Sequence, residues 1–264
     1  MEPHDPAVPE ILRHGRIDVT GRLVDASNAT LFGTVSADGV ELQCVYKPVR
    51  GERPLWDFPD GTLAGREVAT YLISEAAGFE LVPPTVMRDG PFGSGMVQMW
   101  VDTDDEREYV DVCAPRAVPK GWISVLRARG DHGEPAVLVH ADVPELRRMA
   151  AFDVVVNNAD RKGGHVLAGT DGHLYGVDHG LTLHVDDKLR TVLWGWVGQS
   201  LPADVVEPLE KLRAELDGAL CETLGEHITR REIRTLTSRV ETLLGNNRFP
   251  EPSGFGPAIP WPAF

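Results

Sequence analysis

Two stretches that lie close together decide the fold: Asn157-Asn158-Ala159-Asp160-Arg161-Lys162-Gly163-Gly164-His165 and, shortly after it, Val177-Asp178-His179-Gly180. Asp160 follows a candidate helix over residues 143–157, for which Asp142 is the expected cap. Asp178 ends a candidate hairpin that turns at 170–172. Two aspartates at the mouths of adjacent loops suit one catalytic carboxylate and one ligand for Mg²⁺, which prefers oxygen. An aspartate in a loop is commonplace by itself, so the prediction depends on what lies upstream.

Upstream, a lysine on a strand and a glutamate on a helix supply two further groups that phosphoryl transfer needs. Lys47 ends an otherwise apolar strand, which places its stem in the core and its ammonium at the edge of a cleft. Glu67 lies on the next helix, expected over 62–77 with Thr62 or Asp60 as its cap and Gly78 just past its end. Alone, each residue would be interpreted as a solvated surface charge. Their order before the two aspartates favours a lysine that reaches phosphates and a carboxylate that positions it.

The remaining pattern predicts two lobes. Runs of β-branched residues indicate three strands before the Glu67 helix and two after it, at 17–24, 29–35, 40–47, 84–88 and 95–101. Residues 102–120 are typical of a connector, and two amphipathic helices are expected at 204–221 and 229–244. The sequence therefore predicts an α+β fold with a β-rich lobe at 1–101, a mainly helical lobe at 102–249 and a proline-rich tail, extended or disordered, at 250–264.

Composition excludes several classes of partner. The 264 residues include 26 Lys and Arg against 40 Asp and Glu, a formal charge of −14, which argues against nucleic acid and against stable association with an anionic membrane. Three separated cysteines fit a reducing compartment. The first residues lack the basic and apolar regions of a signal peptide, and the apolar stretch 149–156 is too short to span a membrane. We expect a cytoplasmic protein.

The turn at residues 25–30 lies where a phosphate-covering hairpin would be. It lacks the G-x-G-x-x-G pattern of protein kinases. Ser27, Asn28 and neighbouring backbone N–H groups can cap phosphates, and an ordinary hairpin turn explains the same residues equally well.

The layout resembles the phosphatidylinositol 3-/4-kinase-like branch of the protein-kinase-like fold, above all an actinobacterial group of unsettled function related to the type II phosphatidylinositol 4-kinases. The resemblance covers about residues 17–245. It rests on Lys47-Pro48, the Glu67 helix, Leu81-Val82-Pro83-Pro84-Thr85, Gln98-Met99-Trp100-Val101, Asn158-Ala159-Asp160-Arg161 and Val177-Asp178-His179-Gly180.

This resemblance implies ATP and Mg²⁺ as cofactors, with ATP between the lobes. It implies that Lys47 binds the phosphates and pairs with Glu67, and that Asp160 is the catalytic aspartate. Arg161 would stabilise charge or brace the loop, and Asp178 would ligate Mg²⁺. Gln98, Met99, Trp100 and Val101 would form the hinge that holds adenine through backbone groups.

His165 departs from the pattern, because these kinases usually carry a metal-ligating asparagine there. Imidazole prefers softer ions than Mg²⁺. Three alternatives stay open: one metal suffices, His165 contacts phosphate, or the site is weakened. His179 also replaces the middle residue of the DFG motif, which acts by packing.

The expected function is that of an ATP-dependent phosphotransferase acting on a hydroxyl acceptor. The acidic charge, with Lys188 and Arg190 balanced by Asp186 and Asp187, favours a soluble small molecule or a protein over an inositol lipid. A nucleotide-binding pseudokinase with a regulatory role and a transferase of AMP remain alternatives. The crowding of four histidines into residues 165–184 leaves open a His/Asp metal-dependent hydrolase, although no metal-ligand spacing is present.

Overall fold

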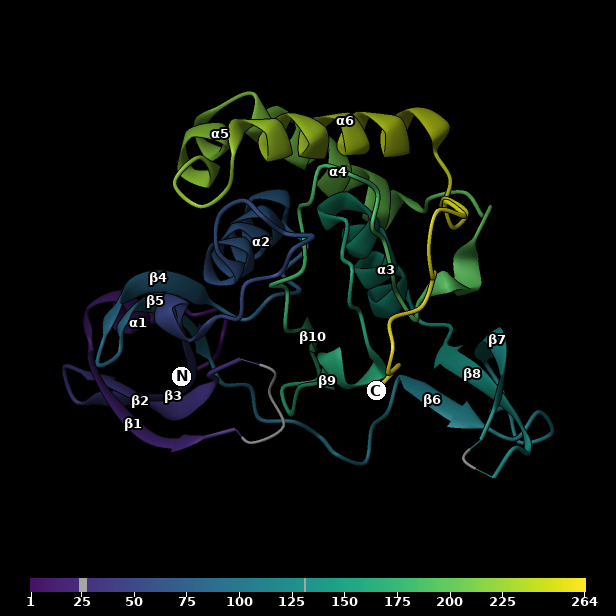
Figure 1. Cartoon of the computed structure of the whole chain (residues 1–264), viewed down its shortest axis with the longest axis horizontal. Coiled ribbons are helices and arrows are strands. Elements are labelled where there is room, and N and C mark those ends of the chain that lie inside the picture. Colours follow the sequence, from purple (N-terminus) through teal and green to yellow (C-terminus); the bar gives the residue numbers. More distant parts are fainter. Residues whose placement is uncertain (24–27, 131) are drawn as a thin grey trace.

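Alternating apolar residues build a five-stranded antiparallel sheet at the amino-terminal end (Figure 1). The computed structural model describes residues 1–23, 28–130 and 132–264. Within them the sheet runs in the order β1-β2-β3-β5-β4. Its strands are β1 Arg16–Arg22, β2 Leu31–Ala37, β3 Val40–Pro48, β4 Thr85–Gly90 and β5 Gly93–Met99. These are the five strands that the sequence predicted, with ends that differ by a few residues.

Two helices cover opposite faces of this sheet. Leu42, Cys44 and Tyr46 of β3 share a core with α1 (Val8–His14), a helix that the sequence pattern did not indicate. Because side chains alternate along a strand, Lys47 points to the other face. Its partner across the sheet, Met96 of β5, packs on that face against α2 (Leu63–Ala77). The strand pleat therefore aims Lys47 at α2.

Helix α2 has the ends that the sequence predicted. The Thr62 side chain accepts a hydrogen bond from the N–H of Gly65, which caps the first turn. Gly78 ends the helix with φ 76°, a left-handed conformation that glycine adopts without steric cost. The caps fix the register that brings Glu67 toward the sheet.

The second lobe is mainly helical but begins with a small sheet. Strands β6 (Val110–Cys113), β8 (Pro135–Ala141) and β7 (Trp122–Arg129) pair antiparallel in that order, and the sheet lies at the edge of the molecule (Figure 1). The sequence reading placed only a connector over 102–120 and missed all three strands. The short hairpin of β9 (Val166–Ala168) and β10 (Leu174–Gly176) leads to the second aspartate loop, as predicted.

Four helices complete this lobe: α3 Pro144–Val156, α4 Ala203–Leu216, α5 Ala219–Leu224 and α6 Arg230–Asn246. The single helix expected over 204–221 is interrupted after Leu216, so α4 and α5 are separate. The predicted cap of α3 is wrong, because Val143 takes the cap position without a side-chain bond. Asp142 instead accepts hydrogen bonds from Arg147 at 2.7 Å and from the Trp196 indole at 2.9 Å.

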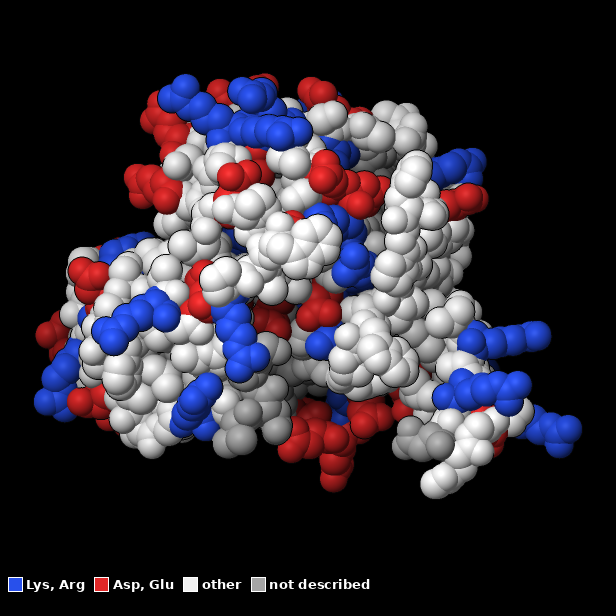
Figure 2. Space-filling model, in the orientation of Figure 1, with Lys and Arg blue, Asp and Glu red and all other residues white. Residues whose placement is uncertain are grey.

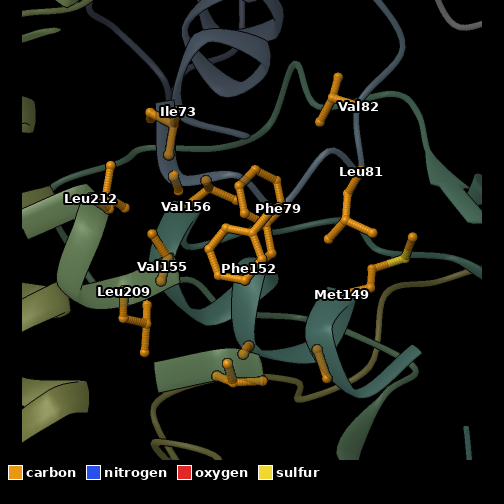
Figure 3. Close-up of a cluster of buried hydrophobic side chains, with 14 of the residues drawn as sticks. Ile73, Phe79, Leu81, Val82, Met149, Phe152, Val155, Val156, Leu209 and Leu212 are labelled. Carbon is orange, nitrogen blue, oxygen red and sulfur yellow. The ribbon is translucent and has the colours of Figure 1, made fainter. Parts of the chain in front are cut away.

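The main hydrophobic core joins α2 to this helical lobe. Ile73 of α2, Phe79 after it and Phe152 of α3 meet there, together with Leu209 and Leu212 of α4 (Figure 3). The rings of Phe79 and Phe152 have centroids 5.2 Å apart. The architecture is thus a two-lobed α+β fold in which α2 is buried between the sheet and the helices. Among the described residues, no helix is both long and apolar enough to cross a membrane.

Candidate active site

Lys47 lies between two carboxylates from different parts of the chain. Its Nζ donates to Glu67 Oε1 at 2.6 Å and to Asp178 Oδ1 at 2.8 Å. The other oxygen of Glu67 accepts the backbone N–H of His179 at 2.9 Å. Strand β3, helix α2 and the loop after β10 are therefore linked through one ammonium group.

The charges in this linkage reinforce one another. Burial opposes the ammonium form of Lys47, but the carboxylates of Asp178 and Glu67 outweigh it and raise the lysine pKa. Lys47 in turn lowers the pKa of Asp178, so both groups are charged at neutral pH. Burial raises the pKa of Glu67, and Lys47 opposes that effect. Asp178 also adopts φ 59°, a left-handed conformation that Asp tolerates better than most residues.

Three side chains that could together hold a metal ion share Asp178 with the group around Lys47. One ligand atom from each of Asp160, His165 and Asp178 lies within 4.8 Å of the others. His165 Nε2 is 3.5 Å from Asp178 Oδ2, and His165 Nδ1 is 2.9 Å from the Asp160 carbonyl oxygen. Burial lowers the pKa of His165 to about 4, so its imidazole is neutral at pH 7. Two carboxylates and a neutral imidazole fit a divalent cation.

Asp160 faces the cleft beside a lysine that the sequence reading did not single out. Its N–H donates to Asn158 Oδ1 at 2.9 Å, which shapes the loop. Lys162 Nζ lies 3.5 Å from the carboxylate. Burial raises the pKa of Asp160, and Lys162 limits the rise. The sequence could have indicated Lys162 through its position, since it follows Asp160 by two residues in the same loop.

Arg161 points the opposite way, into the protein. Its guanidinium donates to both oxygens of Asp153, and neither side chain is exposed at all. Thr191 donates to the same carboxylate at 3.1 Å, and Arg161 Nη2 lies 2.6 Å from Nε2 of His179. Of the two roles considered for Arg161, this placement fits bracing of the loop. Sequence reasoning missed Asp153, which looked like an interruption in an apolar helix.

These side chains form two groups with different surroundings. The cleft cluster consists of Lys47, Glu67, Asp160, His165 and Asp178. The inner cluster consists of Asp153, Asn158, Arg161, His179 and Thr191. The loop that begins at Asp160 contributes to both clusters, because Asp160 lines the cavity and the next residue, Arg161, is buried against Asp153.

A cavity of about 470 Å³ opens over the cleft cluster, and Lys47, Asp160, His165 and Asp178 line it together with residues 98–101. That size suits a nucleotide. A larger cavity of about 640 Å³ lies against α2, α1 and the loop at 223–227, but it contains none of these residues, so we assign the site to the smaller one.

The four predicted hinge residues differ in what they offer a ligand. The Gln98 side chain is buried and donates to Thr85 Oγ1 at 2.8 Å. The N–H groups of Met99 and Trp100 are bonded to the carbonyl oxygens of Pro84 and Gln43, each at 2.9 Å. Within the described chain, the N–H of Val101 has no backbone acceptor, so it can donate to a ligand.

Of the two predicted phosphate-capping residues, one can be placed. Asn28 lines the cavity, and its Oδ1 accepts the N–H of Arg53 at 2.9 Å. Ser27 lies outside the described residues.

Known proteins resemble the chain at two levels. It is 49% identical over 263 residues to the Mycobacterium tuberculosis protein Rv2133c, covering 96% of this chain and 94% of that protein. The chain belongs to the family of Rv2133c. It is also 28% identical to phosphatidylinositol 4-kinase gamma 2 of Arabidopsis thaliana, over 91% of this chain and 50% of that protein. Phosphatidylinositol 4-kinase gamma 4 of Oryza sativa subsp. japonica is 26% identical, over 70% of this chain and 32% of that protein.

The chain spans half or less of each plant kinase. A crystal structure of the Helicobacter pylori proinflammatory kinase CtkA aligns over 90% of this chain and 94% of that one, with 9% identity and a TM-score of 0.47. No family model matches the sequence.

Proposed function

We propose that this protein is an ATP-dependent phosphotransferase of the kinase type, which moves a phosphoryl group to a hydroxyl acceptor. The observation that carries the proposal is the placement of Lys47 between Glu67 and Asp178 at one end of a nucleotide-sized cavity, with Asp160 beside Asp178. The kinase-like relatives support the same reaction class. Phosphoryl transfer needs positioning and electrostatic stabilisation more than covalent chemistry, and this cluster offers both.

Each residue of the cleft cluster has a proposed role. Glu67 holds Lys47 toward the phosphates of ATP, and residues 98–101 hold the base through the backbone at Val101. Asp178 and His165 would hold Mg²⁺, and the chemistry that a bound Mg²⁺ supplies is neutralisation of phosphate charge.

Asp160 is the proposed base. Its carboxylate faces the cavity, and burial raises its pKa toward the range in which it can accept a proton from the acceptor hydroxyl. Lys162 next to it is placed to steady the charge on the transferred group. Arg161 contributes only by holding the loop, because its side chain has no access to the cavity.

For the acceptor, we propose a soluble small molecule or a protein rather than an inositol lipid. The chain carries a formal charge of −14, and acidic and basic side chains are interspersed over the face shown in Figure 2. An enzyme that works on an anionic membrane gains from a continuous basic surface. Lys188, in the segment after Asp178, is already paired with Asp57 at 3.2 Å.

A second candidate is a nucleotide-binding protein with little turnover. The observation that favours it is His165, an imidazole in the metal-binding group where related kinases use an amide oxygen. Such a protein would bind Mg-ATP through the same residues and act on a partner by binding.

Labelled ATP separates these functions. The protein is incubated with Mg²⁺ and either γ-labelled or α-labelled ATP, together with a cell extract, inositol, or vesicles that contain phosphatidylinositol, and the products are identified by mass spectrometry. We expect the γ label to move to a protein or a soluble hydroxyl compound, and Lys47→Met to abolish the transfer. Transfer of the α label would show AMP transfer instead. Binding of ATP without transfer would favour the second candidate, and an absence of binding would refute both.

A further inference from the structure

The tail at residues 250–264 contains no helix or strand, yet it is bonded to the loop that begins at Asp160 and to two residues of the segment that follows Asp178. The carbonyl oxygen of Ala258 accepts the Thr191 N–H at 3.0 Å and the Trp194 indole N–H at 2.9 Å. The carbonyl oxygen of Ala263 accepts the N–H of Gly163 at 2.8 Å. Figure 1 shows this segment running down the helical lobe to a point beside β9. The tail thus connects the segment after Asp178 with the loop that begins at Asp160.

The contact at Gly163 is unusually close. A Cβ atom on Gly163 would lie 2.2 Å from the ring of Phe264, so only glycine leaves room for this ring. The next residue, Gly164, is exposed and has no atom within 4 Å of the same position. Phe264 is 51% exposed, which means that Gly163 and its surroundings cover the other half. Ile259 and Ala263 pack against the main core and anchor the segment.

Gly163 controls where His165 lies. It begins a 3₁₀ turn, Gly163–His165, in which the His165 N–H donates to the Lys162 carbonyl oxygen at 3.2 Å. The His165 carbonyl oxygen then accepts the N–H of Val177 at 3.1 Å, one residue before Asp178. Two consecutive glycines give a loop much backbone freedom. A contact that fixes Gly163 therefore also restricts the positions of Asp160 and His165, which belong to the same loop.

We propose that residues 258–264 are a positioning element for the candidate active site, with the ring of Phe264 on Gly163 as the contact that holds the 160–165 loop in place. None of residues 250–264 lines the cavity, so they position the machinery and do not take part in the chemistry. The link to catalysis rests on the proposed function, whereas the effect on the loop does not.

A double-mutant cycle tests the contact. Gly163→Ala pushes the ring of Phe264 away, and Phe264→Ala removes it, so each change should loosen the same loop. The double variant should be no looser than either single variant, because the three atoms nearest to the new methyl group all belong to the ring. Gly164→Ala adds the same methyl group where nothing lies within 4 Å, and Trp261→Ala removes a tail side chain that is 92% exposed.

The primary measurement is hydrogen exchange of peptides that cover residues 158–167, followed by mass spectrometry, on the full chain without ligand. We expect exchange about tenfold faster in both single variants and in the double variant, and unchanged exchange in the two controls. Turnover is the second measurement. We expect kcat to fall about tenfold in the same three variants, with the KM for ATP within about twofold of the original value.

Two results would overturn the proposal: unchanged exchange in both single variants, or a double variant whose effect equals the product of the single effects. Urea unfolding of each variant shows whether the change is confined to the loop. If the unmodified protein transfers no phosphoryl group, the proposed function fails, and the exchange measurement still decides whether the tail positions the loop.

Discussion

The two polar clusters on either side of the Asp160 loop contain similar groups in opposite situations. In the inner cluster, Arg161 and Asp153 are fully buried and both carboxylate oxygens are bonded. In the cleft cluster, the Asp178 side chain is 50% exposed and that of Lys47 is 21% exposed. A buried charge with all its bonds made within the protein has no capacity left for a ligand. A half-exposed carboxylate bonded to one ammonium can exchange that partner for a metal or a phosphate.

The comparison distinguishes aspartates that stabilise the fold from aspartates that are available to bind a ligand. Three aspartates lie within one region, and only their surroundings distinguish them. Asp153 should matter for stability and hardly for binding, while Asp160 and Asp178 should do the reverse. The following changes test this division, from the largest expected effect to the smallest.

Asp153→Ala should lower the free energy of unfolding by about 3–5 kcal/mol, because it leaves the Arg161 guanidinium buried without its carboxylate. Urea unfolding followed by fluorescence measures the change. Asp186→Ala is the control, because that side chain is 75% exposed and its loss should cost less than about 0.5 kcal/mol. Equal effects of the two substitutions would contradict the assignment of Asp153 to the structure.

Asp160→Asn should lower kcat about 10²- to 10⁴-fold, because the amide cannot accept the proton of the acceptor. Its effect on unfolding should stay within about 1 kcal/mol, since the carboxylate makes one contact at 3.5 Å, with Lys162. The assay is transfer of the γ label under conditions established for the unmodified protein. A variant that keeps full activity would remove Asp160 from the proposed mechanism.

Mg-ATP should stabilise the protein against heat through the cleft cluster. At a concentration 100 times the Kd, the gain is about 2.7 kcal/mol, which raises the Tm by several degrees for a chain of this size. Thermal unfolding with and without Mg-ATP measures it. Lys47→Met and chelation of the metal with EDTA should both reduce the shift, and an equal shift under all conditions would place the nucleotide elsewhere.

Acid should destabilise the inner cluster through His179. Burial and the neighbouring Arg161 lower the pKa of this imidazole well below its usual value, so it stays neutral in the folded protein. The unfolded chain takes up a proton below about pH 6.5 and the folded one does not, so stability falls as the pH decreases, by about 1.4 kcal/mol per pH unit from this group. Above pH 7 the group has no such effect.

His179→Phe isolates this contribution. The slope of unfolding free energy between pH 6.5 and pH 5.5 should be shallower than in the unmodified protein, although the loss of the contact with Arg161 lowers stability at pH 7 as well. An unchanged slope would show that other buried histidines, such as His140, account for the acid sensitivity.

Much of the fold could be predicted because the relevant signals are local. Strand alternation around Lys47, the cap at Thr62 and the glycine at 78 each involve residues close in sequence. The three strands β6, β7 and β8 were missed because proline and charged residues interrupt residues 110–141, and because their pairing is set by contacts between strands. The helix cap at Asp142 was wrong because Arg147 and Trp196 compete for its carboxylate.

The sequence was enough to predict which residues make up the candidate site, but it did not predict which way each side chain points. The order of Lys47, Glu67, Asp160 and Asp178 predicted that all four meet; three of them line the cavity, and the buried Glu67 is bonded to Lys47. No spacing rule shows that Arg161 turns inward, because its partner Asp153 belongs to a helix with an apolar appearance. The contact of the tail with Gly163 is beyond sequence reasoning for the same reason, since it joins positions about a hundred residues apart.

In the sequence, helix α2 lies between strands β3 and β4 of the amino-terminal sheet, but its packing ties it to the helical lobe. Its contact with the sheet is a small group around Val68 and Met96, whereas its other side is part of the main core. Arg66 also bonds to the buried Glu232 of α6 and to the Thr182 carbonyl oxygen. Any opening of the cleft would therefore slide the sheet over α2 while the helix stays behind. Such a motion would lengthen the contact between Lys47 of β3 and Glu67 of α2, so this ion pair would report any movement of the sheet relative to the helical lobe.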